Sequence, residues 1–397
     1  MASQVKLSHL VTTRGHDDLR DAVRQLCAAF DLAYWDKCDG EHRFPREFYE
    51  AFARAGYLNM IVPEEFGGAG ASLAETCAVL EEVAASGGAI NACSSVHLTL
   101  ISMAAVIRHA SAELRSEVLP RLAEGRLIVS FGVTEPDAGT DTTRITSAAR
   151  REGDKYVVNA MKTWNSGAQE AEMVLLLVRT SPYDSANRTA GLSLLLVDLN
   201  APEVTIRPIS KIGRNAVDSN ELYIDGLAVP VDRLVGEEGR GFYHLLDGLN
   251  AERVMLAAEA IGVGRWALRR SSEYASQRVV FDRPIGQNQA VQHPLAACYI
   301  ELAAAACLIR DAATAYDAQA SQRECGELAN MAKYAATEAA FKTTDAAMQT
   351  LGGYSFAREF HIGRHWIESR LQKIAPVNNQ MVLNFVAEKM LGLPRSY

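Results

Sequence analysis

The sequence predicts a mostly α-helical protein with a central β-domain, because its hydrophobic residues change their spacing twice along the chain. Helical spacing fills roughly the first 128 residues, short β-rich runs fill residues 129–238, and helical spacing returns over residues 239–397. The 397-residue chain is 48% hydrophobic, which allows a large core and about two or three domains. We therefore expect an N-terminal helical domain (1–128), a β-domain (129–238) and a C-terminal helical domain (239–397).

The first helix is predicted at residues 17–34, where Leu19, Val23, Leu26 and Phe30 recur at spacings of four, three and four. Similar patterns predict helices at 46–56, 73–86 and 112–123. The middle part holds short apolar runs separated by turn residues, which is typical of strands. These runs are KYVVN (155–159), MVLLLVRT (173–180), LSLLLVDL (192–199), VTIRPI (204–209) and ELYIDGLAV (221–229). Alanine-dense helical patterns then fill 251–275, 289–319 and 326–348.

Composition excludes several classes of protein. The net charge is −8 and no Lys/Arg-rich run stands out, so nucleic acid is not an expected partner. No apolar run reaches the roughly 18 residues of a membrane span, and the N-terminus lacks the apolar region of a signal peptide. The seven cysteines are scattered without a CxxC pair, which is typical of reduced core thiols. We therefore expect a cytoplasmic protein with no membrane partner.

Two segments carry the chemistry of the β-domain. The first, TEPDAGTD (134–141), combines a proline turn with Gly139 and short hydroxyl side chains, and Thr140 lies at its tip. About twenty residues later a β-run ends in KTWNSGA (162–168), which adds a large aromatic plane. Hydroxyls, free amides and one aromatic face are what a planar, polar ring system such as isoalloxazine needs.

This pair of segments resembles the two flavin-embracing segments of the acyl-CoA dehydrogenase family. Further segments match that family in the same order. They are GLNAERVMLAAEAIG (248–262), QRVVFDRPIGQNQAVQHPLA (277–296) and MQTLGGYSFAREF (348–360). The resemblance runs from PEEFGGAG (63–70) to the C-terminus. It implies a helical domain, a small β-barrel or sheet domain and a C-terminal four-helix bundle, assembled as a homotetramer. It also implies an FAD enzyme of fatty acid metabolism that passes electrons from an acyl-CoA to an electron-transfer flavoprotein.

The catalytic base implied by the resemblance is Glu252. Desaturation of an acyl thioester needs a base for the α-proton, a flavin that accepts hydride from the β-carbon, and donors to the thioester oxygen. Many members carry the base near the C-terminus, where this chain has Pro376. Isovaleryl-CoA-type and crotonobetainyl-CoA-type members place it on a helix, at a segment matching Leu249–Arg253. The alternative is that Glu252 is a solvated carboxylate in the first turn of a helix.

Pro376 also removes a donor, because proline has no N–H. The family uses that N–H, with a flavin ribityl hydroxyl, to bind the thioester oxygen. Three explanations stay open: another donor compensates, the turn is shifted by one residue, or the substrate has a more acidic α-proton.

The resemblance implies two groups of flavin contacts. The first group contacts the flavin from the two β-domain segments: Phe131, Val133, Thr134, Gly139, Thr140, Trp164 and Ser166, while Asn378 and Gln380 close over the dinucleotide. The second group reaches the adenine and pyrophosphate of an FAD held by a neighbouring subunit: Arg278, Phe281, Gln289, Gln349, Gly352 and Gly353. The sequence departs from the family at Asp282 and Ala160, where glycine is usual.

Substrate contacts are expected from Thr140, Asn250, Arg253 and Ser94. Surface salt bridging is an equal explanation for Arg253. His97 lies near Ser94 and is more typical of a core histidine. No metal is expected, although His361 and His365 have a spacing of four, because no HExxH glutamate accompanies them.

Three rival functions share this fold or its flavin site. They are a desaturase acting on acyl-carrier-protein thioesters, an oxidase or monooxygenase that uses O₂, and a flavin-binding relative without turnover. Since one fold hosts several reactions, these functions can be distinguished only by the residues of the site.

Overall fold

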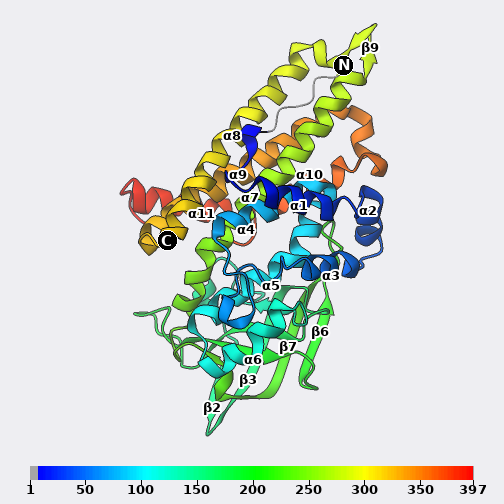
Figure 1. Ribbon diagram of the computed structural model, residues 1–397. Coiled ribbons are helices and arrows are strands. Elements are labelled where there is room, and N and C mark those ends of the chain that lie inside the picture. Colours follow the sequence, from blue (N-terminus) through cyan, green and yellow to red (C-terminus); the bar gives the residue numbers. More distant parts are fainter. Residues whose placement is uncertain (1–7, 397) are drawn as a thin grey trace.

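The computed structural model describes residues 8–396 and confirms a mostly helical chain with a central sheet (Figure 1). The N-terminal helices are α1 (Asp17–Cys27), α2 (Leu32–Gly40), α3 (Arg46–Arg54), α4 (Leu73–Val83), α5 (Ala89–His109) and α6 (Ala112–Ala123). The single helix predicted at 17–34 is therefore two helices. The second begins after Asp31, whose carboxylate accepts a hydrogen bond from the Tyr34 N–H at 2.8 Å and caps α2.

Helices α4 and α5 form one long apolar segment, Leu73–His109, joined by a π-helical turn at Ala84–Gly88. The segment is long and apolar enough to cross a membrane, but 80% of its most apolar stretch is buried inside the protein. A core helix has this property. Gly87 allows the turn with φ +106°, and a side chain there would collide with Leu32 at 2.5 Å.

The central sheet contains every predicted strand and three that the sequence did not reveal. The strands are β1 (Val129–Gly132), β2 (Ala148–Glu152), β3 (Lys155–Ser166), β4 (Met173–Arg179), β5 (Leu192–Asp198), β6 (Val204–Pro208), β7 (Ser219–Pro230) and β8 (Leu234–Val235). Their order is β6-β7-β3-β2-β4-β5-β8, and β1 pairs with β4 in parallel. Strands β1, β2 and β8 were missed because they are short or carry a run of charged residues.

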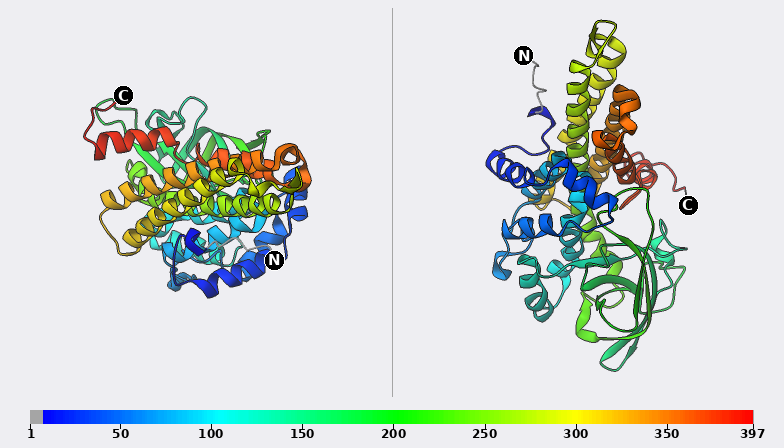
Figure 2. Two further views of the ribbon diagram at one scale, coloured as in Figure 1. Left: turned by 90° about the horizontal axis from the view of Figure 1, so that it is seen from above. Right: turned by 90° about the vertical axis from the view of Figure 1, so that its right-hand side faces the viewer.

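The C-terminal part is built on α7 (Gly241–Gln277), which packs against α8 (Gln289–Asp317) and α9 (Gln322–Leu351). Helices α10 (Ile362–Gln372) and α11 (Asn379–Phe385) follow. Figure 2 shows α7, α8 and α9 running side by side, with the hairpin β9–β10 (Val279–Val280 and Arg283–Pro284) beyond the end of α7. Helix α7 also packs against α4 and α5, so it contacts both helical parts of the protein.

Candidate active site

The two segments predicted to hold flavin lie side by side and are joined by hydrogen bonds. The Thr163 N–H donates to the Thr134 carbonyl at 2.9 Å, and Asn165 Nδ2 donates to the Phe131 carbonyl at 3.0 Å. Lys162 Nζ donates to the Val133 carbonyl at 3.2 Å. The carbonyls of Phe131, Val133 and Thr134 thus accept hydrogen bonds from the second segment.

A buried ion pair fixes the same two segments. Lys162 Nζ lies 2.8 Å from Glu135 Oε1, and Glu135 also accepts hydrogen bonds from the Thr146 and Ser147 N–H groups. Burial lowers the pKa of Lys162 to about 8 despite the carboxylate, while the Lys162 charge and these donors hold the pKa of Glu135 below its usual value. Sequence reasoning missed this pair, because charged residues in a turn and on a strand are usually solvated.

Trp164 lies on an irregularity of the sheet. The register of β3 against β7 shifts between Lys162 and Asn165, and Trp164 has φ +63°. Such a backbone conformation is unfavourable for a large residue and often marks a functional position. The bulge turns the indole outward, where it is 58% exposed. An exposed tryptophan on a strained bulge provides a flat apolar surface for a planar ligand.

Ser166 has a hydroxyl that is available to donate. Arg214 Nη2 lies 2.8 Å from Ser166 Oγ, and a guanidinium can only donate, so Ser166 Oγ accepts this bond. The Ser166 O–H is then left to donate elsewhere. The same guanidinium contacts Ser219 Oγ at 2.7 Å and Ser94 Oγ at 3.3 Å. Arg214 therefore joins the predicted flavin residue Ser166 to the predicted substrate residue Ser94, and no sequence motif singled it out.

The C-terminal segment containing Pro376 reaches the first flavin segment. Asn378 Nδ2 lies 3.3 Å from Thr140 Oγ1, although 238 positions separate the two residues. The buried Lys333 of α9 holds this segment, donating to the Val377 carbonyl and to Asn379 Oδ1, both at 2.7 Å. Gln380 is exposed nearby, as is Gly139 on the other segment. The structure thus brings Gly139, Thr140, Asn378 and Gln380 to one place.

Glu252 is buried in the interior of α7, far from the first turn at Gly241. The alternative of a solvated first-turn carboxylate is therefore wrong. The side chain is 6% exposed, and within the described residues its Oε2 atom has no hydrogen-bond partner. Burial raises the pKa of Glu252 to about 7, against the opposing charges of His97 and Arg253. A carboxyl group with a pKa near neutrality suits a general base.

Arg253, next to Glu252, is also buried, and its Nη1 donates to Asn250 Oδ1 at 2.8 Å. Burial lowers the pKa of Arg253 below its usual value. Among the residues that the structure describes, Arg253 forms no ion pair within 4.0 Å, so the surface salt-bridge explanation is wrong. Its buried Nε has no partner there either. Arg253 and Asn250 thus form a polar pair one and two positions from the candidate base.

In the second group of predicted flavin contacts, Arg278 and Phe281 lie at the end of α7 and on the β9–β10 hairpin. Arg278, Gly352 and Gly353 line one pocket of about 480 Å³ next to the β9–β10 hairpin. Gln349 and Gly352 border a second cavity of about 770 Å³, and Gln289 is exposed at the start of α8. Phe281, on the hairpin, is 93% exposed. Figures 1 and 2 place the β9–β10 hairpin at the end of the helices opposite the sheet. The cavity bordered by Gln349 and Gly352 is also lined by Gly213 and Asn215, which flank the Arg214 that bonds Ser166.

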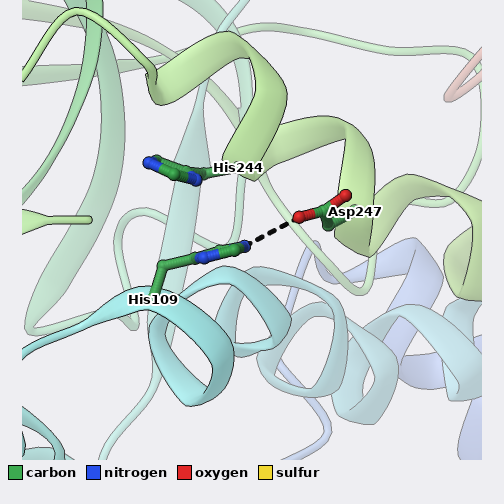
Figure 3. A group of neighbouring side chains, drawn as sticks. All are labelled: His109, His244 and Asp247. Atoms are coloured by element: carbon green, nitrogen blue, oxygen red, sulfur yellow. Dashed lines mark hydrogen bonds and ion pairs between the residues drawn. The ribbon is translucent and has the colours of Figure 1, made fainter. Parts of the chain in front are cut away.

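Two histidine clusters lie outside these groups. His109, His244 and Asp247 join the end of α5 to the start of α7 (Figure 3). The two rings are tilted by 35° with centroids 4.2 Å apart, His109 Nε2 bonds Asp247 Oδ2 at 2.9 Å, and His244 Nε2 accepts from the Glu237 N–H. His365 instead stacks on Trp266 at 3.6 Å and bonds the His361 carbonyl.

Comparison with known proteins identifies one family over most of the chain. Family models for acyl-CoA dehydrogenase match as N-terminal domain over 13–126, middle domain over 130–227 and C-terminal domain over 239–391. Acyl-CoA dehydrogenase FadE12 of Mycobacterium tuberculosis is 36% identical over 379 residues, covering 96% of each chain. Cyclohex-1-ene-1-carbonyl-CoA dehydrogenase of Syntrophus aciditrophicus is 32% identical, covering 94% of this chain and 89% of that protein. A glutaryl-coenzyme A dehydrogenase solved with glutaryl-CoA superposes with a TM-score of 0.89 at 27% identity, covering 100% of this chain and 98% of that one.

Fold, site and relatives together define a flavoprotein oxidoreductase that acts on acyl-CoA. The chain belongs to the acyl-CoA dehydrogenase family. Its members are flavoproteins, and the residues around Trp164 and Ser166 suit a flavin ring, since they offer an exposed aromatic face and a hydroxyl donor.

Proposed function

We propose that this protein introduces an α,β double bond into an acyl-CoA thioester, with FAD as its cofactor and Glu252 as its base. The observation that carries the proposal is the buried Glu252 carboxylate, which has a pKa near neutrality and, among the described residues, an oxygen without a hydrogen-bond partner. FAD, when bound, supplies the acceptor for hydride from the β-carbon of the substrate.

The surroundings of Glu252 support its role, because the charged groups that act on it are connected to both flavin segments. On one side, the charge of Arg253 interacts with that of Lys333. Lys333 is hydrogen-bonded to the segment whose Asn378 contacts Thr140. On the other side, His97 and Ser94 share a face of α5, and Ser94 contacts Arg214 beside Ser166. A thioester placed between α7 and these segments would have its α-carbon near the base.

Each group of residues has one task in this proposal. Glu252 takes the α-proton, and burial keeps water from competing for it. Trp164 and Ser166 position the flavin ring, while Thr140, Asn250, Arg253 and Ser94 contact the substrate. The thioester oxygen needs donors other than a Pro376 N–H. Under this proposal residues 129–238 carry the flavin, residues 239–397 carry the base, and residues 1–128 cover the acyl group.

We further propose that the active form is a homotetramer. The distance between Arg278 and the base Glu252 supports this. From Glu252 to Arg278 the chain rises about 1.5 Å per residue along α7, so the two residues are roughly 40 Å apart. Arg278 therefore lies far from the base of its own chain, and it can serve the FAD of a neighbouring subunit. An electron-transfer flavoprotein is the proposed electron acceptor, and the cytoplasm the proposed location.

The test is anaerobic bleaching of the flavin by a panel of acyl-CoAs. We expect at least one acyl-CoA to bleach the wild-type protein, and the Glu252→Gln variant to bleach at least about a hundredfold more slowly. The matched control is Glu273→Gln, the same substitution at an exposed position of α7, which should react at the wild-type rate.

Other outcomes would identify a different function or cofactor. Bleaching by acyl-carrier-protein thioesters alone identifies a biosynthetic desaturase. Oxygen consumption without anaerobic bleaching identifies an oxidase or monooxygenase. No reaction with any thioester identifies a flavin-binding relative without turnover, and extraction of FMN in place of FAD contradicts the cofactor assignment.

A further inference from the structure

Helix α7 presents two buried carboxylates on one face. Glu252 and Glu259 are seven residues apart, close to two turns, so their side chains project in the same direction about 10 Å apart along the helix. Glu259 is 0% exposed, and within residues 8–396 its Oε2 atom, like that of Glu252, has no hydrogen-bond partner. Two buried carboxylates on one face repel each other and require a positive group nearby.

His97 provides this group from α5, which packs along α7. His97 Nδ1 lies 2.5 Å from Glu259 Oε1, and both side chains are buried. A positive charge on His97 also acts on Glu252, where it lowers the pKa, whereas burial and the Glu259 charge raise it. His97 is therefore hydrogen-bonded to one carboxylate and electrostatically coupled to the other.

The remaining charged neighbours do not replace His97. Arg253 lowers the pKa of Glu252, but its guanidinium is hydrogen-bonded to Asn250, and burial disfavours its charged form. Lys333 of α9 faces Arg253. The groups that face Glu259 are Cys77 on α4, Cys93 on α5 and Arg214.

We propose that His97, held by Glu259, is the positioning residue that favours the ionised form of the base Glu252. The inference rests on the proposed function, in which Glu252 must be an anion before it takes the α-proton. Burial alone opposes the anion, and the His97 charge offsets that effect. A histidine that only fills the core would not have this influence.

The test compares His97→Gln with the double variant His97→Gln/Glu259→Gln. The single variant keeps a hydrogen-bond donor but leaves the Glu259 charge uncompensated. The pH midpoint of the Glu252 titration should therefore rise on the order of one pH unit. The double variant removes both charges of the pair and should return the midpoint towards the wild-type value. Loss of core packing alone predicts the opposite order, with the double variant more disturbed than the single one.

Two readouts are needed, and one does not depend on turnover. Infrared spectroscopy of the purified holoprotein follows the protonated carboxyl band that is missing in Glu252→Gln, as a function of pH. The pH dependence of flavin reduction by acyl-CoA is the second readout. The matched control is His365→Gln, because His365 is also buried but faces neither Glu252 nor Glu259, and it should leave the midpoint unchanged.

The inference is overturned if His97→Gln leaves the infrared midpoint of Glu252 unchanged or lowers it, or if the double variant moves it further from wild type. Should His97→Gln fail to fold, His97→Asn tests the same charge. A Glu252→Gln variant that reduces its flavin at the wild-type rate contradicts the proposed function instead. The infrared titration still tests the coupling of His97 to Glu252 in that case.

Discussion

Glu252, the proposed base, is a residue whose ionisation weakens the fold. Its pKa is about 7 in the folded protein against the ordinary 4.5, so the folded state binds the proton more tightly than the unfolded state does. The stability that this group contributes is full below about pH 4.5 and is lost as the pH rises through about 7. At higher pH the folded protein contains a buried, poorly solvated carboxylate.

Glu252→Gln should therefore stabilise the protein in a pH-dependent way. We expect the free energy of unfolding to rise by up to roughly 3 kcal/mol near pH 8 and to change little near pH 4. Urea denaturation at the two pH values measures this. An equal change at both values would show that packing, and not ionisation of Glu252, is responsible.

Trp164 is a second residue where function opposes local stability. Because a non-glycine residue at φ +63° costs about 1 kcal/mol, Trp164→Gly should relieve the backbone while removing the aromatic face. We expect the protein to fold but to purify with much less flavin, measured as the flavin-to-protein absorbance ratio. Trp164→Phe should retain most of the flavin. Full flavin occupancy in the glycine variant would rule out the indole as a wall of the site.

At the scale of elements, the Lys162–Glu135 pair holds the end of β3 against the turn after β1. Lys162→Met leaves Glu135 buried without its counter-charge, which should destabilise the protein by about 3–5 kcal/mol. The double variant Lys162→Met/Glu135→Gln should recover part of that loss, because no uncompensated charge is left. Thermal melting of both variants provides the measurement, and additive losses would show that the pair is not coupled.

The helices and strands show what the sequence could and could not predict. Periodicity predicted the α-β-α order and the strands β3 to β7, because long apolar runs and alternating patterns dominate there. It could not separate α1 from α2, since the break depends on one capping aspartate. It also missed Lys162–Glu135, Arg214–Ser166 and His97–Glu259, because each pair joins residues far apart in sequence that meet only after folding. The resemblance to the family identified Glu252, but only the fold showed that it is buried.

At the scale of the whole molecule, exposed apolar residues gather at the end of the helices away from the sheet. Phe281, Val279 and Val280 belong to the β9–β10 hairpin, and Phe356 borders the larger cavity. Exposed apolar groups of this kind mark interaction surfaces. The predicted flavin contacts Arg278 and Phe281 lie at the same end, so the proposed assembly predicts that subunit association and FAD binding depend on each other.

Phe281→Asp should therefore reduce assembly and FAD content together. Light scattering with absorbance detection measures both in one experiment. The proposed tetramer should give way to smaller species with less FAD per chain, since a charge is placed where a neighbouring subunit is expected. A wild-type protein that is an FAD-saturated monomer would contradict the proposed assembly directly.

The central claim is that Glu252 removes the α-proton of an acyl-CoA, and hydrogen exchange tests it most directly. A saturated acyl-CoA that bleaches the flavin is incubated anaerobically in heavy water with wild-type protein or with Glu252→Gln, and mass spectrometry follows deuterium at the α-carbon. We predict exchange with the wild type and at least about a hundredfold slower exchange with the variant. Equal exchange by both proteins would show that another group is the base.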